Sequence, residues 1–158
     1  MKVPQKSYTL DEARSKLENY CAYQERCHQE VRETLRKMRM IPEAADQIIV
    51  HLIENDFLNE ERFARKYCSG KFHIKNWGRN RLRRELKQRN ISKYNIEKGL
   101  GEIDDETYLQ AFDELAMRKW ELLSKEKNLL KRKKKLADYL FYRGWESDLV
   151  YPKLSELK

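Results

Sequence analysis

The chain has 158 residues, which suffices for one compact domain or a few small stacked units. Apolar residues make up 40% and charged residues 38%, with only 3 prolines and 5 glycines, and this balance favours a helical protein over a disordered or sheet-rich one. No apolar run approaches the roughly 18–20 residues of a membrane span, and residues 1–10 lack a signal-peptide core, so we expect a cytoplasmic protein with no membrane partner.

The net charge of +8 is concentrated in the middle third of the chain. Residues 57–101 hold 13 basic and 4 acidic side chains, a net +9, whereas residues 1–56 sum to −1 and residues 102–158 to 0. A positive field focused in this way attracts a polyanion or an acidic protein surface and speeds the encounter with it.

Helical spacing predicts three helices in residues 1–56. Thr9 and Glu12 form a capping box that begins the first helix. The second begins near residues 27–28 and ends at Ile41, because the residue before Pro42 disfavours the helical region. The third helix has an apolar stripe made of Ala45, Ile48, Ile49, Leu52 and Ile53.

The pattern restarts in residues 57–101. Asn59 is expected to cap a helix that contains Phe63, and Gly70 is expected to loosen the end of that helix. Trp77 and Gly78 then break the chain before a helix over residues 79–89, in which Leu82 and Leu86 face inward. Asn90 occupies the position of a left-handed C-cap, and Ser92 caps a short third helix.

Residues 102–158 predict a third round of helices. Asp104, Asp105 and Glu106 begin a long helix with an apolar face formed by Leu109, Phe112, Leu115, Ala116, Leu122 and Leu123. The next helix starts near Asn128 and ends at Gly144, and the last starts near Glu146. Leucines recur 14 residues apart in the second and third rounds, which predicts an all-α fold of tandem three-helix repeats over residues 1–56, 57–101 and 102–158.

Three stretches carry a resemblance to a known family: DFLNEERFA from Asp56, WG with RLRREL from Trp77, and LFYRGW from Leu140. They resemble the RecX family, bacterial modulators of the RecA recombinase. The residues that form this structural motif are Asp56, Phe57, Phe63, Trp77, Gly78, Leu82, Leu86, Ile91, Tyr142, Arg143, Gly144 and Trp145. The chain departs from the family pattern at Arg79, where a proline is usual, and at Asn90, where a glycine is usual.

The resemblance implies both a fold and a partner. The implied fold is three tandem three-helix repeats in an elongated, bent arrangement. The implied function is binding along the groove of the RecA–DNA filament, which lowers the ATPase, strand-exchange and coprotease activities of RecA in recombination, DNA repair and the SOS response. We expect the protein to act as a monomer.

The basic residues of the middle unit are the candidate partner-binding site, for the RecA filament or for phosphate. They are Arg79, Arg81, Arg83, Arg84, Lys87 and Arg89. A run of charge is more often a solvated helix face, but its confinement to 45 residues favours binding. A second basic run supplies auxiliary candidates, namely Lys131, Arg132, Lys134 and Lys135.

Nothing in the sequence favours an enzyme, a metal site or a cofactor. Cys21, Cys27 and Cys68 lack the spacing of a zinc site, and the chain has neither a phosphate-binding glycine loop nor a paired nucleophile and base. Two alternatives stay open beside filament regulation. One is a direct DNA-binding helical-repeat protein, and the other is a passive adaptor for an acidic partner.

Overall fold

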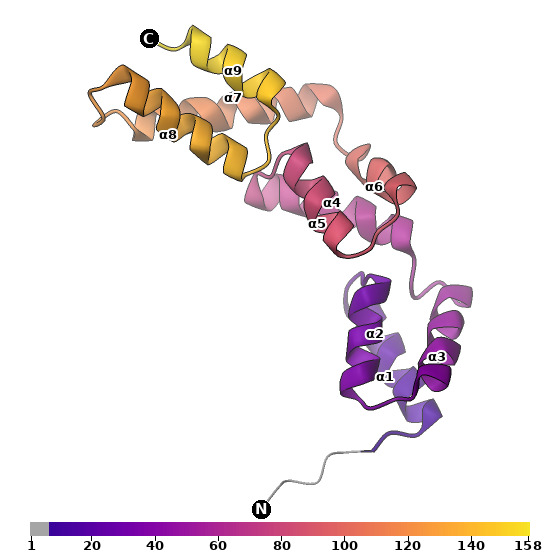
Figure 1. Ribbon diagram of the computed structural model, residues 1–158. Coiled ribbons are helices and arrows are strands. Elements are labelled where there is room, and N and C mark those ends of the chain that lie inside the picture. Colours follow the sequence, from indigo (N-terminus) through magenta and orange to yellow (C-terminus); the bar gives the residue numbers. More distant parts are fainter. Residues whose placement is uncertain (1–6) are drawn as a thin grey trace, which may run out of the picture.

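The computed structural model describes residues 7–158, and every regular element in that range is an α-helix, as predicted. The helices are α1 (Leu10–Tyr23), α2 (His28–Lys37), α3 (Pro42–Glu54), α4 (Glu60–Lys75), α5 (Arg79–Gln88), α6 (Lys93–Leu100), α7 (Asp105–Leu122), α8 (Leu129–Tyr142) and α9 (Ser147–Glu156). They form an elongated, bent molecule with α1–α3 at one end and α7–α9 at the other (Figure 1).

Local signals place most helix starts where the sequence predicts them, but α2 ends at Lys37 rather than at Ile41, because Arg39 adopts a left-handed conformation with φ of 60°. The capping box at the start of α1 is complete, because Thr9 and Glu12 exchange backbone and side-chain hydrogen bonds. Side chains also cap α4, α6, α7 and α8, and the cap residues are Asn59, Ser92, Asp104 and Asn128. Asn90 adopts the predicted left-handed conformation, with φ of 58°, and Gly144, where the eighth helix is expected to end, has φ of 90°.

Further details of the predicted helices are wrong. Ile53 of the predicted α3 stripe is 46% exposed, whereas the other four members of that stripe are buried. Gly70 does not loosen the end of its helix, since α4 continues to Lys75 and is terminated by Asn76 with φ of 57°. In α7, Leu109 and Leu122 do not join the buried face. Tyr108 and Trp120 are buried instead, because they share one helical stripe with Phe112, Leu115 and Ala116.

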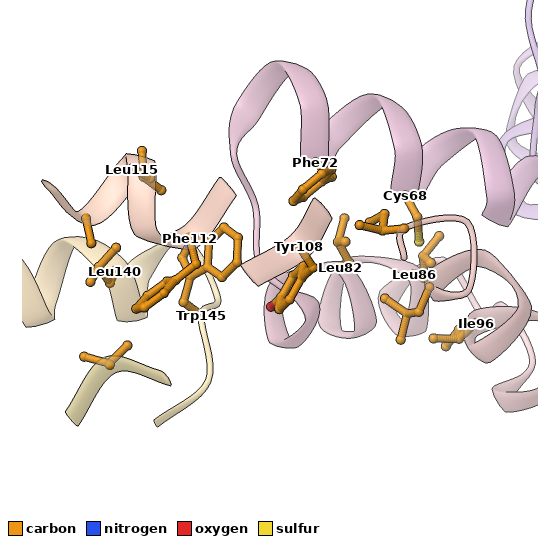
Figure 2. Close-up of a cluster of buried hydrophobic side chains, with 14 of the residues drawn as sticks. Cys68, Phe72, Leu82, Leu86, Ile96, Tyr108, Phe112, Leu115, Leu140 and Trp145 are labelled. Carbon is orange, nitrogen blue, oxygen red and sulfur yellow. The ribbon is translucent and has the colours of Figure 1, made fainter. Parts of the chain in front are cut away.

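The buried side chains form two clusters rather than three. One is formed by α1–α3 together with Leu58, and the other extends from α4 to α9 and also includes Cys27. Figure 2 shows Phe72, Tyr108, Phe112 and Trp145 between the leucines of the middle unit and those of the last unit. The ring centres of Tyr108 and Trp145 lie 4.6 Å apart. The predicted division into three domains, at residues 56 and 101, stays a prediction.

Candidate partner-binding surface

The start of α5 is fixed by the turn that follows α8. The backbone N–H of Gly78 donates to the Arg143 carbonyl at 2.7 Å, and that of Asn80 donates to the Gly144 carbonyl at 3.0 Å. The indole N–H of the buried Trp145 donates to the Asn76 carbonyl at 3.1 Å. Residues of the middle and last motif stretches therefore meet at one joint, which sets the orientation of the arginine-rich helix α5.

A second joint lies between α3 and α4, where the first motif stretch begins. Asp56 has φ of 61°, and its backbone carbonyl accepts a hydrogen bond from Arg62 at 2.9 Å. The Arg62 guanidinium also pairs with the carboxylates of Asp56 at 3.1 Å and Glu25 at 2.6 Å. Arg62 thus connects the first helical unit to the second.

Arg79 is held inside the joint between the last two units. Its guanidinium pairs with Asp105 at 2.7 Å and Glu146 at 3.4 Å, and lies 3.9 Å from the ring centre of Tyr108. The Tyr108 hydroxyl accepts a hydrogen bond from the Arg79 backbone and donates one to Glu146. Burial, followed by the bond to Glu146, raises the pKa of Tyr108, so this hydroxyl stays protonated as a donor.

Arg81 and Arg89 are likewise held against aromatic rings. The Arg81 guanidinium lies 4.2 Å from the ring centre of Trp77 and 4.8 Å from that of Tyr142, and it donates to the Tyr142 carbonyl at 3.2 Å. The Arg89 guanidinium lies 4.9 Å from the ring centre of Tyr67 and pairs with Glu85 at 3.4 Å. In these cation–π contacts the ring attracts the guanidinium and holds the arginine side chain in one position.

Of the six predicted binding residues, Arg84 and Lys87 have no ion pair or hydrogen bond from their side chains to any other described residue. Arg83 is exposed but pairs with Glu97 at 3.2 Å. The structure therefore divides the predicted site into four groups. Arg79 and Arg81 lie at the joint with the last unit, and Arg89 is held against Tyr67 within the second unit. Arg83 is a paired surface arginine, and Arg84 and Lys87 are exposed cations on α5.

The two exposed cations line a groove between α5 and α6. Its volume is about 680 Å³, and its walls are formed by Asn80, Arg83, Arg84, Lys87, Ile91, Lys93, Ile96 and Glu97. Sequence reasoning missed Lys93, the exposed first residue of α6, although its place directly after the Ser92 cap was a usable signal. The groove combines three cations without internal ion pairs and two buried isoleucines, which suits an anionic partner.

The auxiliary basic residues differ in whether their side chains have partners within the protein. Arg132 stacks 3.8 Å from the ring centre of Trp120 and donates to the Trp120 carbonyl at 2.6 Å. Lys134 pairs with Asp138, and Lys135 with Glu126, each at 2.9 Å. The hydrogen bond from Lys135 lowers the pKa of Glu126. Lys131 is exposed.

Within residues 7–158, no group of His, Cys, Asp and Glu side chains is arranged to hold a metal ion. The three cysteines are free and buried, and burial raises the pKa of Cys21 and Cys27 to about 11 and that of Cys68 to about 12. These thiols are therefore protonated at neutral pH.

None of the described helices combines the length and the apolar character that crossing a bilayer requires.

Two family models match the chain. The second three-helix domain of RecX matches residues 59–100, and the third three-helix domain of RecX matches residues 106–154. Among curated proteins, the regulatory protein RecX of Listeria monocytogenes serovar 1/2a is 27% identical over 132 residues, which cover 84% of this chain and 49% of the relative. The regulatory protein RecX of Bacillus cytotoxicus is 28% identical over 140 residues, covering 89% of this chain and 52% of the relative.

Solved structures agree in fold. The crystal structure of RecX from Lactobacillus salivarius has a TM-score of 0.80 at 22% identity, covering 94% of this chain and 96% of that one. A further crystal structure of regulatory protein RecX has a TM-score of 0.82 at 20% identity, covering 94% and 73%. This chain spans about half the length of the curated relatives named above. Matched by two RecX domain models across its second and third helical units, the chain belongs to the RecX family.

Proposed function

We propose that this protein is a non-enzymatic regulator that acts in the cytoplasm as a monomer, binds the RecA filament on DNA and inhibits its ATPase, strand-exchange and coprotease activities. Family membership supports a regulatory role, since the curated relatives are named regulatory proteins. The observation that carries the proposal for this chain is the α5–α6 groove. It holds the exposed cations Arg84, Lys87 and Lys93 on the helical unit with net charge +9.

The groove supplies two kinds of interaction. Its cations attract an acidic surface or phosphate over a range of about one Debye length, roughly 8 Å at physiological ionic strength. Its buried isoleucines, Ile91 and Ile96, keep the groove in shape, because they belong to the core shared by α4–α9. The middle unit would then dock first, while the outer units extend along the filament and oppose the changes in subunit packing that accompany ATP turnover.

Charge reversal in the groove tests the proposal. R84E/K87E should raise the concentration needed to inhibit the DNA-dependent ATPase of RecA by about tenfold or more, because attraction becomes repulsion at the contact. The matched control is K66E/K75E, which makes the same charge change on exposed residues of α4 in the same unit. The control should inhibit nearly as well as the parent. Equal inhibition by both variants would show that the groove is only solvated surface.

A salt titration separates filament binding from direct DNA binding. If the cations simply neutralise phosphates, affinity for bare DNA should fall steeply with salt and should match affinity for the filament. If the filament protein contributes, the parent should bind the filament more tightly than bare DNA at every salt concentration. R84E/K87E should then reduce the difference between the two affinities.

A further inference from the structure

The turn between α7 and α8 is a second concentration of positive charge. Residues 118–135 hold 9 basic and 2 acidic side chains, a net +7, whereas the remainder of residues 102–158 sums to −7. The last unit has zero net charge only because this positive segment is balanced by acidic residues elsewhere in the unit. We call the turn and the adjoining helix ends, from Leu122 to Leu130, the tip. Figure 1 places this turn at the end of the α7–α8 pair, far from α1–α3.

The same tip exposes leucine side chains. Leu122 at the end of α7 is 73% exposed, and Leu129 and Leu130 at the start of α8 are 44% and 80% exposed. The short connection between the two helices brings all three to one end of the helix pair. Lys125 and Lys127 lie between them in sequence, are exposed, and have no ion pair or hydrogen bond from their side chains within residues 7–158.

The structure beneath the tip is ordered by specific contacts. Trp120 is buried in the core, and Arg132 covers its ring and its backbone carbonyl. Asn128 caps α8, and Glu126 accepts hydrogen bonds from Lys135 and from the Asn128 backbone. The exposed leucines are therefore presented on a preorganised support, which lowers the entropic cost of binding.

The combination of leucines and lysines identifies the kind of partner. Phosphates alone would satisfy the lysines but leave the leucines in water. Exposed leucines that occur in one short segment with lysines instead suit a protein–protein contact, in which a few buried apolar anchors supply most of the affinity. The partner surface that complements it is an apolar pocket bordered by carboxylates.

We infer that this tip, defined by Leu122, Lys125, Lys127, Leu129 and Leu130, is a second docking element that inserts its leucines into an acidic-edged apolar pocket on the protein of the filament. The inference rests on the proposed function. It adds that the last unit makes its own protein contact, at the opposite end of the α4–α9 body from the first unit. Binding is then bivalent within one chain, which raises affinity without requiring a second molecule.

Leucine replacement tests the tip. L122S/L130S should weaken binding to the RecA–DNA filament by about tenfold or more, and should leave binding to bare DNA unchanged, because DNA does not bury the leucines. The control is V50S/I74S, which replaces aliphatic residues of α3 and α4 that are 51% and 76% exposed. The control should bind the filament as the parent does. K125E/K127E should also weaken filament binding, with a shallower dependence on salt than the parent.

The outcomes are distinguishable. Failure of the parent to bind the filament overturns the proposed function and the tip contact together. Binding of L122S/L130S with parental affinity overturns the tip contact alone, as does an equal loss on bare DNA. Binding of the parent and of L122S/L130S to vesicles of phosphatidylcholine and phosphatidylserine in equal parts is measured as well. If L122S/L130S loses affinity for these vesicles but not for the filament, the tip binds an anionic membrane and the protein contact is overturned. A circular dichroism melt of each variant verifies that it is folded.

Discussion

At the scale of single residues, two glycines allow α5 and the end of α8 to approach closely. A Cβ built on Gly78 would lie 2.5 Å from the Gly144 carbonyl oxygen, and one built on Gly144 would collide with the Arg81 backbone. Gly144 also has φ of 90°, a conformation that side chains disfavour. The joint between the second and third units therefore requires glycine at both positions for steric reasons.

Gly144→Ala should destabilise the protein by about 2–5 kcal/mol, since backbone strain and overpacking act together. The measurement is the midpoint of urea unfolding. Gly70→Ala is the matched control, because Gly70 is in the interior of α4 with open space around it. That change should stabilise the protein by roughly 0.5–1 kcal/mol. A Gly144→Ala protein as stable as the parent would show that the turn after α8 relaxes.

At the scale of elements, α7 depends on its N-cap. The Asp104 carboxylate accepts a hydrogen bond from the Thr107 backbone at 2.7 Å and another from the Thr107 hydroxyl at 3.0 Å. The backbone bond, and then the hydroxyl bond, lower the pKa of Asp104 below its ordinary value of 3.8. A carboxyl group whose pKa is lowered on folding contributes stability above its unfolded pKa, and the contribution is lost as the pH falls through the folded value.

Asp104→Ala should therefore lower the melting temperature at pH 7 more than at a pH well below 3.8. Asp104→Asn provides the comparison, because asparagine keeps the acceptor but does not titrate. It should retain most of the stability at pH 7 and lose this part of the pH dependence. Parallel melting curves for the parent and the alanine variant at both pH values would contradict a charged cap.

At the scale of the whole molecule, the two buried clusters divide the chain unequally. The helices α4–α9 share one continuous core, whereas α1–α3 have their own. The first unit is joined to the rest by Arg62 with its partners Glu25 and Asp56, and by two apolar contacts. Cys27 packs into the larger cluster, and Leu58, just before α4, packs into the smaller one. The angle between the first unit and the remainder therefore depends on few contacts.

Arg62→Ala should broaden the distribution of that angle while leaving the helix content unchanged, because each core is intact. Small-angle X-ray scattering measures the change as an altered radius of gyration. The control is Arg32→Ala, which removes an ion pair with Asp46 that lies inside the first unit. Scattering curves that coincide for the parent and Arg62→Ala would show that the joint is held by other contacts.

The sequence by itself determined the helical class, the main helix starts, and the family. These features are readable because they are local. Thr9, Asn59 and Ser92 cap helices through bonds to residues three positions away, and Gly144 occupies a left-handed turn that its own neighbours define. The motif stretches are likewise contiguous in sequence, so their resemblance to RecX needed no structure.

Only the tertiary structure decided which cations are available to a partner. Arg79 pairs with Asp105 and Glu146, the latter 67 residues away, so helical spacing on α5 could not identify it as a joint residue. The role of Tyr108 could not be predicted from the sequence, because its hydroxyl bonds Glu146 and the Arg79 backbone, which only folding brings near it. The positive charge of residues 118–135 is visible in the sequence, but a sum over the whole last unit cancels it. Only the structure shows that this segment forms the end of the α7–α8 pair and that its leucines are exposed.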